Sequence, residues 1–301
     1  MNLRPRYHSS SEEHFETFEE SPLLCSRLPL NPVMKILKAL TMGLCLMAFT
    51  VFGSWAHGQD ASSGESKWEF TVTPYFWMAG IDGDVGVKGV TSHVDYSFSD
   101  ILDQLDYGGE VHVEAWKSNL GIFFDATYLK LSADATVSPL LGPIDVDADM
   151  DEWLVEFGGL YRFAKWPLGK EEGRALSLES VGGGRYWYLK GKLDASAPLV
   201  GLARKVEGSK DWIDPIIGLR LRADLTKKLS LALRGDIGGF GVGSDFSWNA
   251  SAIFGYSFSD LISVWLGYRA LGVDYESGSG RSKFKFDVTM YGPIVGLGFR
   301  F

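Results

Sequence analysis

The residues best suited to acid–base chemistry lie on either side of position 112. His112 is two residues from Glu110 and two from Glu114, so in an extended strand these side chains share one face. A histidine beside carboxylates can act as a general base. No serine nucleophile stands out near it, however, and one strand cannot supply a complete catalytic triad. We therefore expect a polar network, no catalytic residues and no enzymatic activity, with a lipid- or ester-processing enzyme as the alternative.

Alternating aspartates form a second candidate site, for a metal ion: Asp145, Asp147, Asp149 and Asp151. In an extended strand their carboxylates point one way, on the face that carries Trp153. Hard cations such as Ca²⁺ and Mg²⁺ prefer oxygen ligands, but Met150 stands where an EF-hand calcium loop needs glycine. The pattern predicts either a weakly bound Ca²⁺ or Mg²⁺ or a solvated acidic stretch. We expect no other cofactor.

The N-terminal part of the chain indicates export. Lys35 and Lys38 precede an apolar stretch, and small residues follow, so residues 34–58 are predicted to be a secretory signal peptide. The apolar stretch is shorter than the roughly 20 residues that a membrane-spanning helix needs. Residues 1–33 would then be a mis-called or disordered extension, and residues 59–67 a short periplasmic lead.

Composition excludes two further classes of function. Both cysteines, Cys25 and Cys45, precede the expected mature chain, so neither disulfides nor thiol chemistry is expected there. The net charge of −9 argues against a nucleic-acid partner.

From residue 68 onward, apolar and polar residues alternate with a period of two, which is typical of strands. These segments are longer than the usual five or six residues, and their polar faces are too charged for the core of a soluble sandwich. The pattern predicts an all-β fold, a transmembrane antiparallel up-and-down barrel with its apolar face outward. About ten strands are expected, with eight or twelve as alternatives: 68–78, 108–117, 120–132, 150–163, 174–190, 211–224, 228–239, 246–258, 261–272 and 284–301.

The chain ends in GPIVGLGFRF, in which Gly296, Phe299 and Phe301 match a C-terminal assembly signal. In this respect residues 68–301 resemble Gram-negative outer-membrane β-barrel proteins, in particular small porin-like ones. The resemblance implies integral location in the outer membrane, contact with its lipid and lipopolysaccharide, and the barrel-assembly machinery as a partner during biogenesis. The alternating aspartates would then lie at the depth of lipopolysaccharide phosphates, where a divalent cation could bridge the two. The resemblance does not indicate an oligomeric state.

Three polar segments, 133–149, 191–210 and 273–283, are expected to be long external loops. Residues 79–107 are left over, and we expect an excursion or plug that lies over the barrel mouth or in the lumen. The motif YSFSD occurs at 96–100 and at 256–260. We interpret it as a signal that ends a strand. In the first copy Ser99 or Asp100 would cap a short helix, and in the second copy the motif would form a tight turn.

Projecting the polar faces inward gives a lumen with acidic and basic walls, and ten strands lie close to the size that side chains fill. The sequence therefore predicts a narrow passive pore for small solutes or a structural envelope barrel. The expected lumen charges are Glu69, Glu110, His112, Glu114, Asp125, Glu156, Arg162, Glu179, Arg185, Asp214, Arg220, Arg222, Arg234, Asp236, Arg269 and Arg300.

Overall fold

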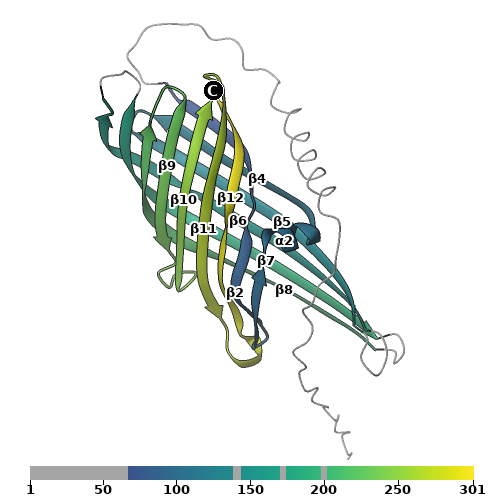
Figure 1. The fold of residues 1–301 in the computed structure, drawn as a ribbon. Coiled ribbons are helices and arrows are strands. Elements are labelled where there is room, and N and C mark those ends of the chain that lie inside the picture. The colour runs from purple at the N-terminus through teal and green to yellow at the C-terminus, as the bar shows by residue number, and fades with distance from the viewer. Residues whose placement is uncertain (1–66, 138–143, 170–173, 198–201) are drawn as a thin grey trace, which may run out of the picture. The chain divides into compact units, whose positions relative to one another are not determined.

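The computed structural model describes residues 67–137, 144–169, 174–197 and 202–301, so the expected N-terminal extension and signal peptide lie outside the described residues. In the described part, ten antiparallel strands form a closed barrel (Figure 1). Pairing of the first strand with the last closes it, which confirms the predicted fold class. The strands are β1 (Glu69–Trp77), β4 (Leu105–Lys117), β5 (Leu120–Val137), β6 (Ile144–Pro167), β7 (Ala175–Ala197), β8 (Leu202–Asp224), β9 (Leu229–Gly238), β10 (Phe246–Ser257), β11 (Ile262–Ser277) and β12 (Phe284–Arg300).

The outer surface of the barrel is apolar, as the alternation predicts. On β8, Ile217 and Leu219 are exposed, whereas the preceding residue, Ile216, is buried in the lumen. Aromatic side chains are exposed towards both ends of the strands, the pattern of the two interfacial girdles of a membrane barrel. They include Trp68, Phe70, Tyr161, Phe163, Trp166, Tyr256 and Phe258 at the end where the barrel chain starts and stops, and Tyr107, Trp153, Phe246 and Tyr291 towards the other.

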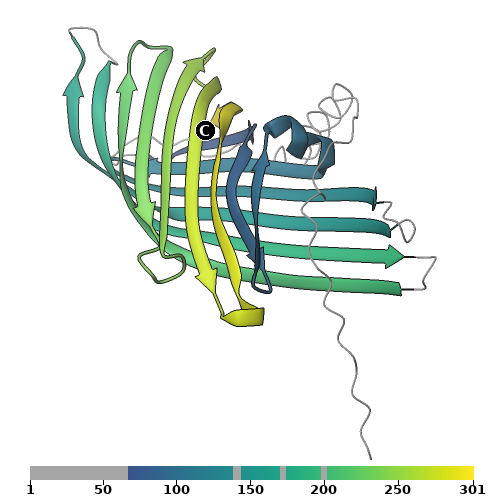
Figure 2. The ribbon, with the colours of Figure 1, turned by 60° about the horizontal axis from the view of Figure 1, so that its bottom comes forward.

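Strands β5–β8 continue well past the remaining strands (Figures 1 and 2). β4 pairs with β5 only as far as Leu131, and β9 pairs with β8 only from Ile216 onward. The result is an open four-stranded sheet, called here the extension, made of residues 131–137, 144–150, 191–197 and 202–208.

The prediction of long loops at 133–149, 191–210 and 273–283 was therefore wrong for most of their residues. Outside the membrane both faces of a strand can be polar, so the alternation that marks a strand disappears. Cross-strand ion pairs hold this sheet together instead. The Lys192 ammonium lies 3.2 Å from a carboxylate oxygen of Asp149 on β6, and it also lies 2.8 Å from one of Asp194 on its own strand.

Residues 79–107 are not a plug. They contain a hairpin, β2 (Gly80–Val87) and β3 (Val90–Tyr96), whose first strand pairs with β12 and continues the barrel wall above β1. Lys88 and Gly89 at its tip both have positive φ angles, as a two-residue hairpin turn requires.

The wall divides where this hairpin begins. β4 pairs with β1 only up to the pair of Glu110 and Tyr75, and beyond it β3 and β4 follow separate paths. Helix α2 (Phe98–Gln104) contacts β2, β3 and β5, and its Leu102 is buried. We call the unpaired boundary between β3 and β4 the seam.

The two copies of YSFSD both end a strand, but the expected cap at Ser99 or Asp100 was misplaced by two or three residues. Ser97 caps α2, and Asp100 completes a capping box by accepting from the Ser97 backbone N–H. In the second copy, the Ser259 hydroxyl accepts from the backbone N–H groups of Leu261 and Ile262 in a tight turn. No helix in the described part of the chain is long and apolar enough to cross a membrane.

Candidate functional site in the barrel lumen

A cavity of about 610 Å³ occupies one end of the lumen. Its lining reaches the turn residues Ser259 and Asp260 and, at the end of β12, Arg300. Short turns join the strands there, and β1 begins at the same end, which in outer-membrane barrels faces the periplasm. We call this cavity the vestibule.

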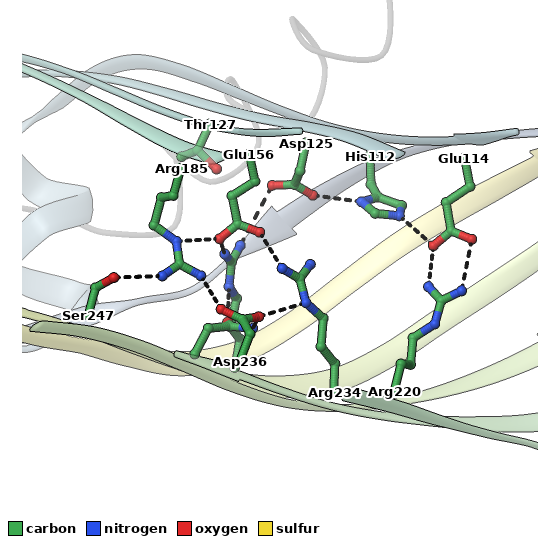
Figure 3. A network of polar contacts seen from close by, with 12 residues as sticks. His112, Glu114, Asp125, Thr127, Glu156, Arg185, Arg220, Arg234, Asp236 and Ser247 are labelled. Atoms are coloured by element: carbon green, nitrogen blue, oxygen red, sulfur yellow. Dashed lines mark hydrogen bonds and ion pairs between the residues drawn. The ribbon is translucent and has the colours of Figure 1, made fainter. Parts of the chain in front are cut away.

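The inner end of the vestibule is closed by a cluster of charged side chains (Figure 3). The Arg185 guanidinium, which has no exposed surface, donates to Glu156 at 2.7 Å and to Asp236 at 2.7 Å. From the opposite wall, Arg269 donates to the same Glu156 oxygen at 2.8 Å. Arg234 donates to Asp236 at 2.8 Å and lies 3.1 Å from the other Glu156 oxygen. Each buried charge therefore has an opposite charge in contact, which burial requires.

His112 links this cluster to a second one nearer the periplasm. Its Nδ1 lies 2.9 Å from Asp125 and its Nε2 lies 3.0 Å from Glu114, an arrangement that a ring protonated on both nitrogens satisfies. Glu114 also accepts from Arg220, and Arg220 donates to Glu179 at 2.7 Å. We call the whole set the charge network: Glu114, Asp125, Glu156, Glu179 and Asp236 with His112, Arg162, Arg185, Arg220, Arg234 and Arg269.

The other expected lumen charges lie around this network. Glu69, Arg222 and Arg300 line the vestibule near its mouth. Asp214 is fully buried and accepts from the Ser244 backbone N–H at 2.7 Å. Glu110 accepts from a backbone N–H at the seam, as described below.

Beyond the charge network the lumen is filled by apolar side chains. Trp187 and Trp212 stack with ring centroids 5.7 Å apart, and Tyr275 stacks on Trp212 at 4.0 Å. Phe286 meets both indoles edge-on. We call this buried set the aromatic layer: Trp77, Leu154, Trp187, Leu189, Trp212, Leu271, Val273, Phe286, Val288, Met290 and Ile294, with Tyr275 packed against it.

The seam begins at a single hydrogen bond. One carboxylate oxygen of Glu110 accepts from the Trp77 backbone N–H at 2.5 Å, the first such group above the last pair of β1 with β4. The Glu110 carboxylate thereby takes the place of the backbone carbonyl that β4 would supply to this N–H if the two strands were still paired.

Replacing Glu110 with alanine should therefore destabilise the barrel by about 1–3 kcal/mol, because a buried N–H loses its acceptor. Glu110→Gln keeps a carbonyl acceptor and should recover most of that loss. Urea unfolding in lipid vesicles measures both. Equal losses for alanine and glutamine would show that the charge, and not the acceptor, is what the seam needs.

The alternating aspartates do not form the unpartnered set that the expected cation site requires. Asp149 accepts from Lys192 and Ser132, which lower the pKa of its carboxyl, and Asp151 accepts from Tyr128. The side chain of Asp145 is outside the described part. No group of three or more histidines, cysteines or acidic residues in the described part is placed to hold a metal ion. Asp149 is thus already paired with a lysine of the neighbouring strand.

The residues of the expected assembly signal lie where β12 meets β1. Phe301 exchanges two backbone hydrogen bonds with Phe70, and Gly296 lies opposite Tyr75, where a Cβ would meet the tyrosine Cβ at 2.9 Å. Phe299 is half-buried on the outer face. Recognition by the assembly machinery stays a prediction.

Sequence reasoning missed one buried carboxylate. Glu152 points into the lumen and is only 7% exposed. The alternation could have found it, because Glu152 shares the face of Glu156. The aromatic layer was also missed, although the alternation of β1 and β12 places Trp77 and Phe286 on inward faces.

Neither a protein-family model nor a curated protein sequence matches the chain. Among solved structures, it is similar to the outer membrane protease OmpT from Escherichia coli, at 9% identity and a TM-score of 0.44 over 81% of this chain and 99% of that one. It is also similar to the translocator domain of the autotransporter NalP from Neisseria meningitidis, at 12% identity and a TM-score of 0.37 over 79% and 90%. A third is the attachment invasion locus protein Ail of Yersinia pestis, at 12% identity and a TM-score of 0.32 over 79% and 99%.

These structures are outer-membrane barrels, and the likeness concerns the fold alone. The closed sheet, the apolar exterior and the charged interior are independently those of a barrel that spans a membrane. The chain has the fold and the surface of an integral outer-membrane β-barrel of Gram-negative bacteria.

Proposed function

We propose that this integral outer-membrane β-barrel is a sealed envelope protein with a vestibule open to the periplasm, and not a permanently open pore. The observation that carries the proposal is the burial of the charge network. Glu156, Glu179 and Arg185 have essentially no exposed surface in the middle of the lumen. A solute that moved one of them aside would leave its partner buried and uncompensated, which is strongly unfavourable. The aromatic layer closes the lumen a second time on the outer side.

The enzyme alternative finds little support around His112. Both ring nitrogens face carboxylate oxygens, so neither is available to accept a proton from a nucleophile. In the part of the chain that the structure describes, no hydroxyl group is hydrogen-bonded to this ring.

Planar-bilayer recording separates a sealed barrel from the narrow passive pore that the sequence suggested. The purified barrel should insert without producing stable, discrete conductance steps, while a general porin recorded in the same lipid should produce them. Stable steps from the folded barrel, absent after heat denaturation, would refute the sealed lumen.

A further inference from the structure

Glu152 is unlike the other buried carboxylates of the lumen. Glu110, Glu114, Asp125, Glu156, Glu179, Asp214 and Asp236 each have a hydrogen bond or an ion pair. Within the described residues Glu152 has neither, although only 7% of it is exposed. An unpaired carboxylate is costly to bury, and such a group in a native structure calls for an explanation.

The surroundings of Glu152 on the sheet are apolar. Its strand partners are Leu129 on β5 and Leu189 on β7. The residues two positions away on the same face of β6 are Met150 and Leu154. Among the described residues no cation is paired with Glu152, so a positive charge from outside the chain would find an unshared counter-ion.

Aromatic rings lie beside this carboxylate. Leu154 is the strand partner of Trp187, which places Trp187 diagonally next to Glu152. Trp187 belongs to the stack with Trp212 and Tyr275. Both indole N–H groups are buried without an acceptor. Indole and phenol rings attract cations electrostatically, so the stack and the carboxylate favour the same kind of ligand.

An apolar surface leads to Glu152 from the outer side. The two faces of the extension differ, since one carries the charged ladder of Lys192, Asp149 and Glu207. The other continues the lumen wall beyond Glu152 and carries small or apolar side chains that are half-buried or exposed: Leu131, Ala133, Ala148, Met150, Gly191, Leu193, Val206 and Gly208. We call this face the ledge.

We propose that the outer end of the lumen binds a small apolar molecule that carries one positive charge, an aryl- or alkylammonium, with Glu152 as its counter-ion. The apolar part lies on the ledge and against the aromatic layer. Among the described residues, the nearest cation in cross-strand register with Glu152 is Lys210, which lies two strands away on β8. The site is on the opposite side of the charge network from the vestibule, so it does not depend on the lumen being sealed.

The test compares two probes of the same shape, 4-phenylbutylammonium and neutral 4-phenylbutanol, binding to the folded barrel in nanodiscs at low salt. Tryptophan fluorescence reports binding at the stack. The ammonium should bind roughly 10- to 100-fold more tightly than the alcohol, as charge-assisted hydrogen bonds to carboxylates allow. Glu152→Gln should remove that preference and leave alcohol binding unchanged.

Glu207→Gln is the matched control, because it removes a carboxylate from the charged face of the same extension. It should leave the preference intact. Glu152→Leu provides a second readout, since loss of an unpaired buried carboxylate should raise resistance to urea while it abolishes the ammonium preference. Equal binding of the two probes to the unmodified barrel, an unchanged preference in Glu152→Gln, or lower urea resistance in Glu152→Leu would each overturn the proposal.

Discussion

Replacing Arg185 with alanine should destabilise the barrel by about 3–5 kcal/mol, the range observed when one partner of a buried ion pair is removed. Arg185 has no exposed surface and donates to Glu156, Asp236 and Ser247. Its loss leaves Glu156 and Asp236 in the centre of the lumen with one fewer cation, and water that entered the vacated space would carry no compensating charge. The urea midpoint and slope of unfolding in lipid vesicles give the free-energy difference.

Lys190→Ala is the control for this prediction. Lys190, at the base of the extension, also forms an ion pair, at 2.8 Å with Glu207, but the two side chains are 39% and 45% exposed. Such pairs contribute little to stability, so the urea midpoint should barely move. If the two alanine variants were equally stable, the charge network would not be the buried, fully paired cluster described above.

Gly183→Ala, which adds a single methyl group, should destabilise the barrel by about 1–3 kcal/mol or prevent its assembly. Gly183 lies opposite Gly158 in the pairing of β6 with β7, and a Cβ at Gly183 would collide with the Phe157 carbonyl oxygen. That contact is with backbone, so no side-chain rotation relieves it.

Gly191→Ala makes the same chemical change on the same strand, and nothing lies within 4 Å of the added Cβ. That variant should be neutral or slightly stabilised, because alanine restricts the unfolded chain. Heat-modifiable migration on gels and urea unfolding compare the two. A destabilisation as large in Gly191→Ala as in Gly183→Ala would assign the effect to glycine flexibility in β7 and not to close strand approach.

The period-two alternation was sufficient to predict the barrel and the direction of most side chains. Ile217 and Arg220 on β8 face opposite sides of the wall, as the pattern requires, because a strand in a bilayer must present an apolar face to lipid. The same constraint ends at the membrane surface. Asp149 and Lys192 lie beyond it, where cross-strand pairing takes the place of apolar patterning, and this is why the extension was interpreted as loops.

Partner choice inside the lumen could not be predicted from the sequence. Glu114 and Arg220 are 106 positions apart, and Glu156 and Arg269 are 113 apart, so only the closed sheet brings them together. The hairpin of β2 and β3 was missed for a related reason. Its pairing with β12 is set by the register of the closing strands, and nothing local to Gly80–Val87 indicates that partner.

One-sided labelling of a cysteine at position 251 tests the sealed lumen most directly. Ser251 lines the vestibule, and no cysteine occurs after Cys45, so Ser251→Cys introduces a unique thiol into the barrel. A separate variant, Ser209→Cys, places a thiol on the exposed part of β8 near the extension. Its labelling reports which end of the barrel faces outward in proteoliposomes. A small charged maleimide added to the periplasmic side should modify residue 251 rapidly, whereas the same reagent on the outer side should modify residue 209 and leave residue 251 unreacted. Equal labelling of residue 251 from both sides would contradict the sealed barrel.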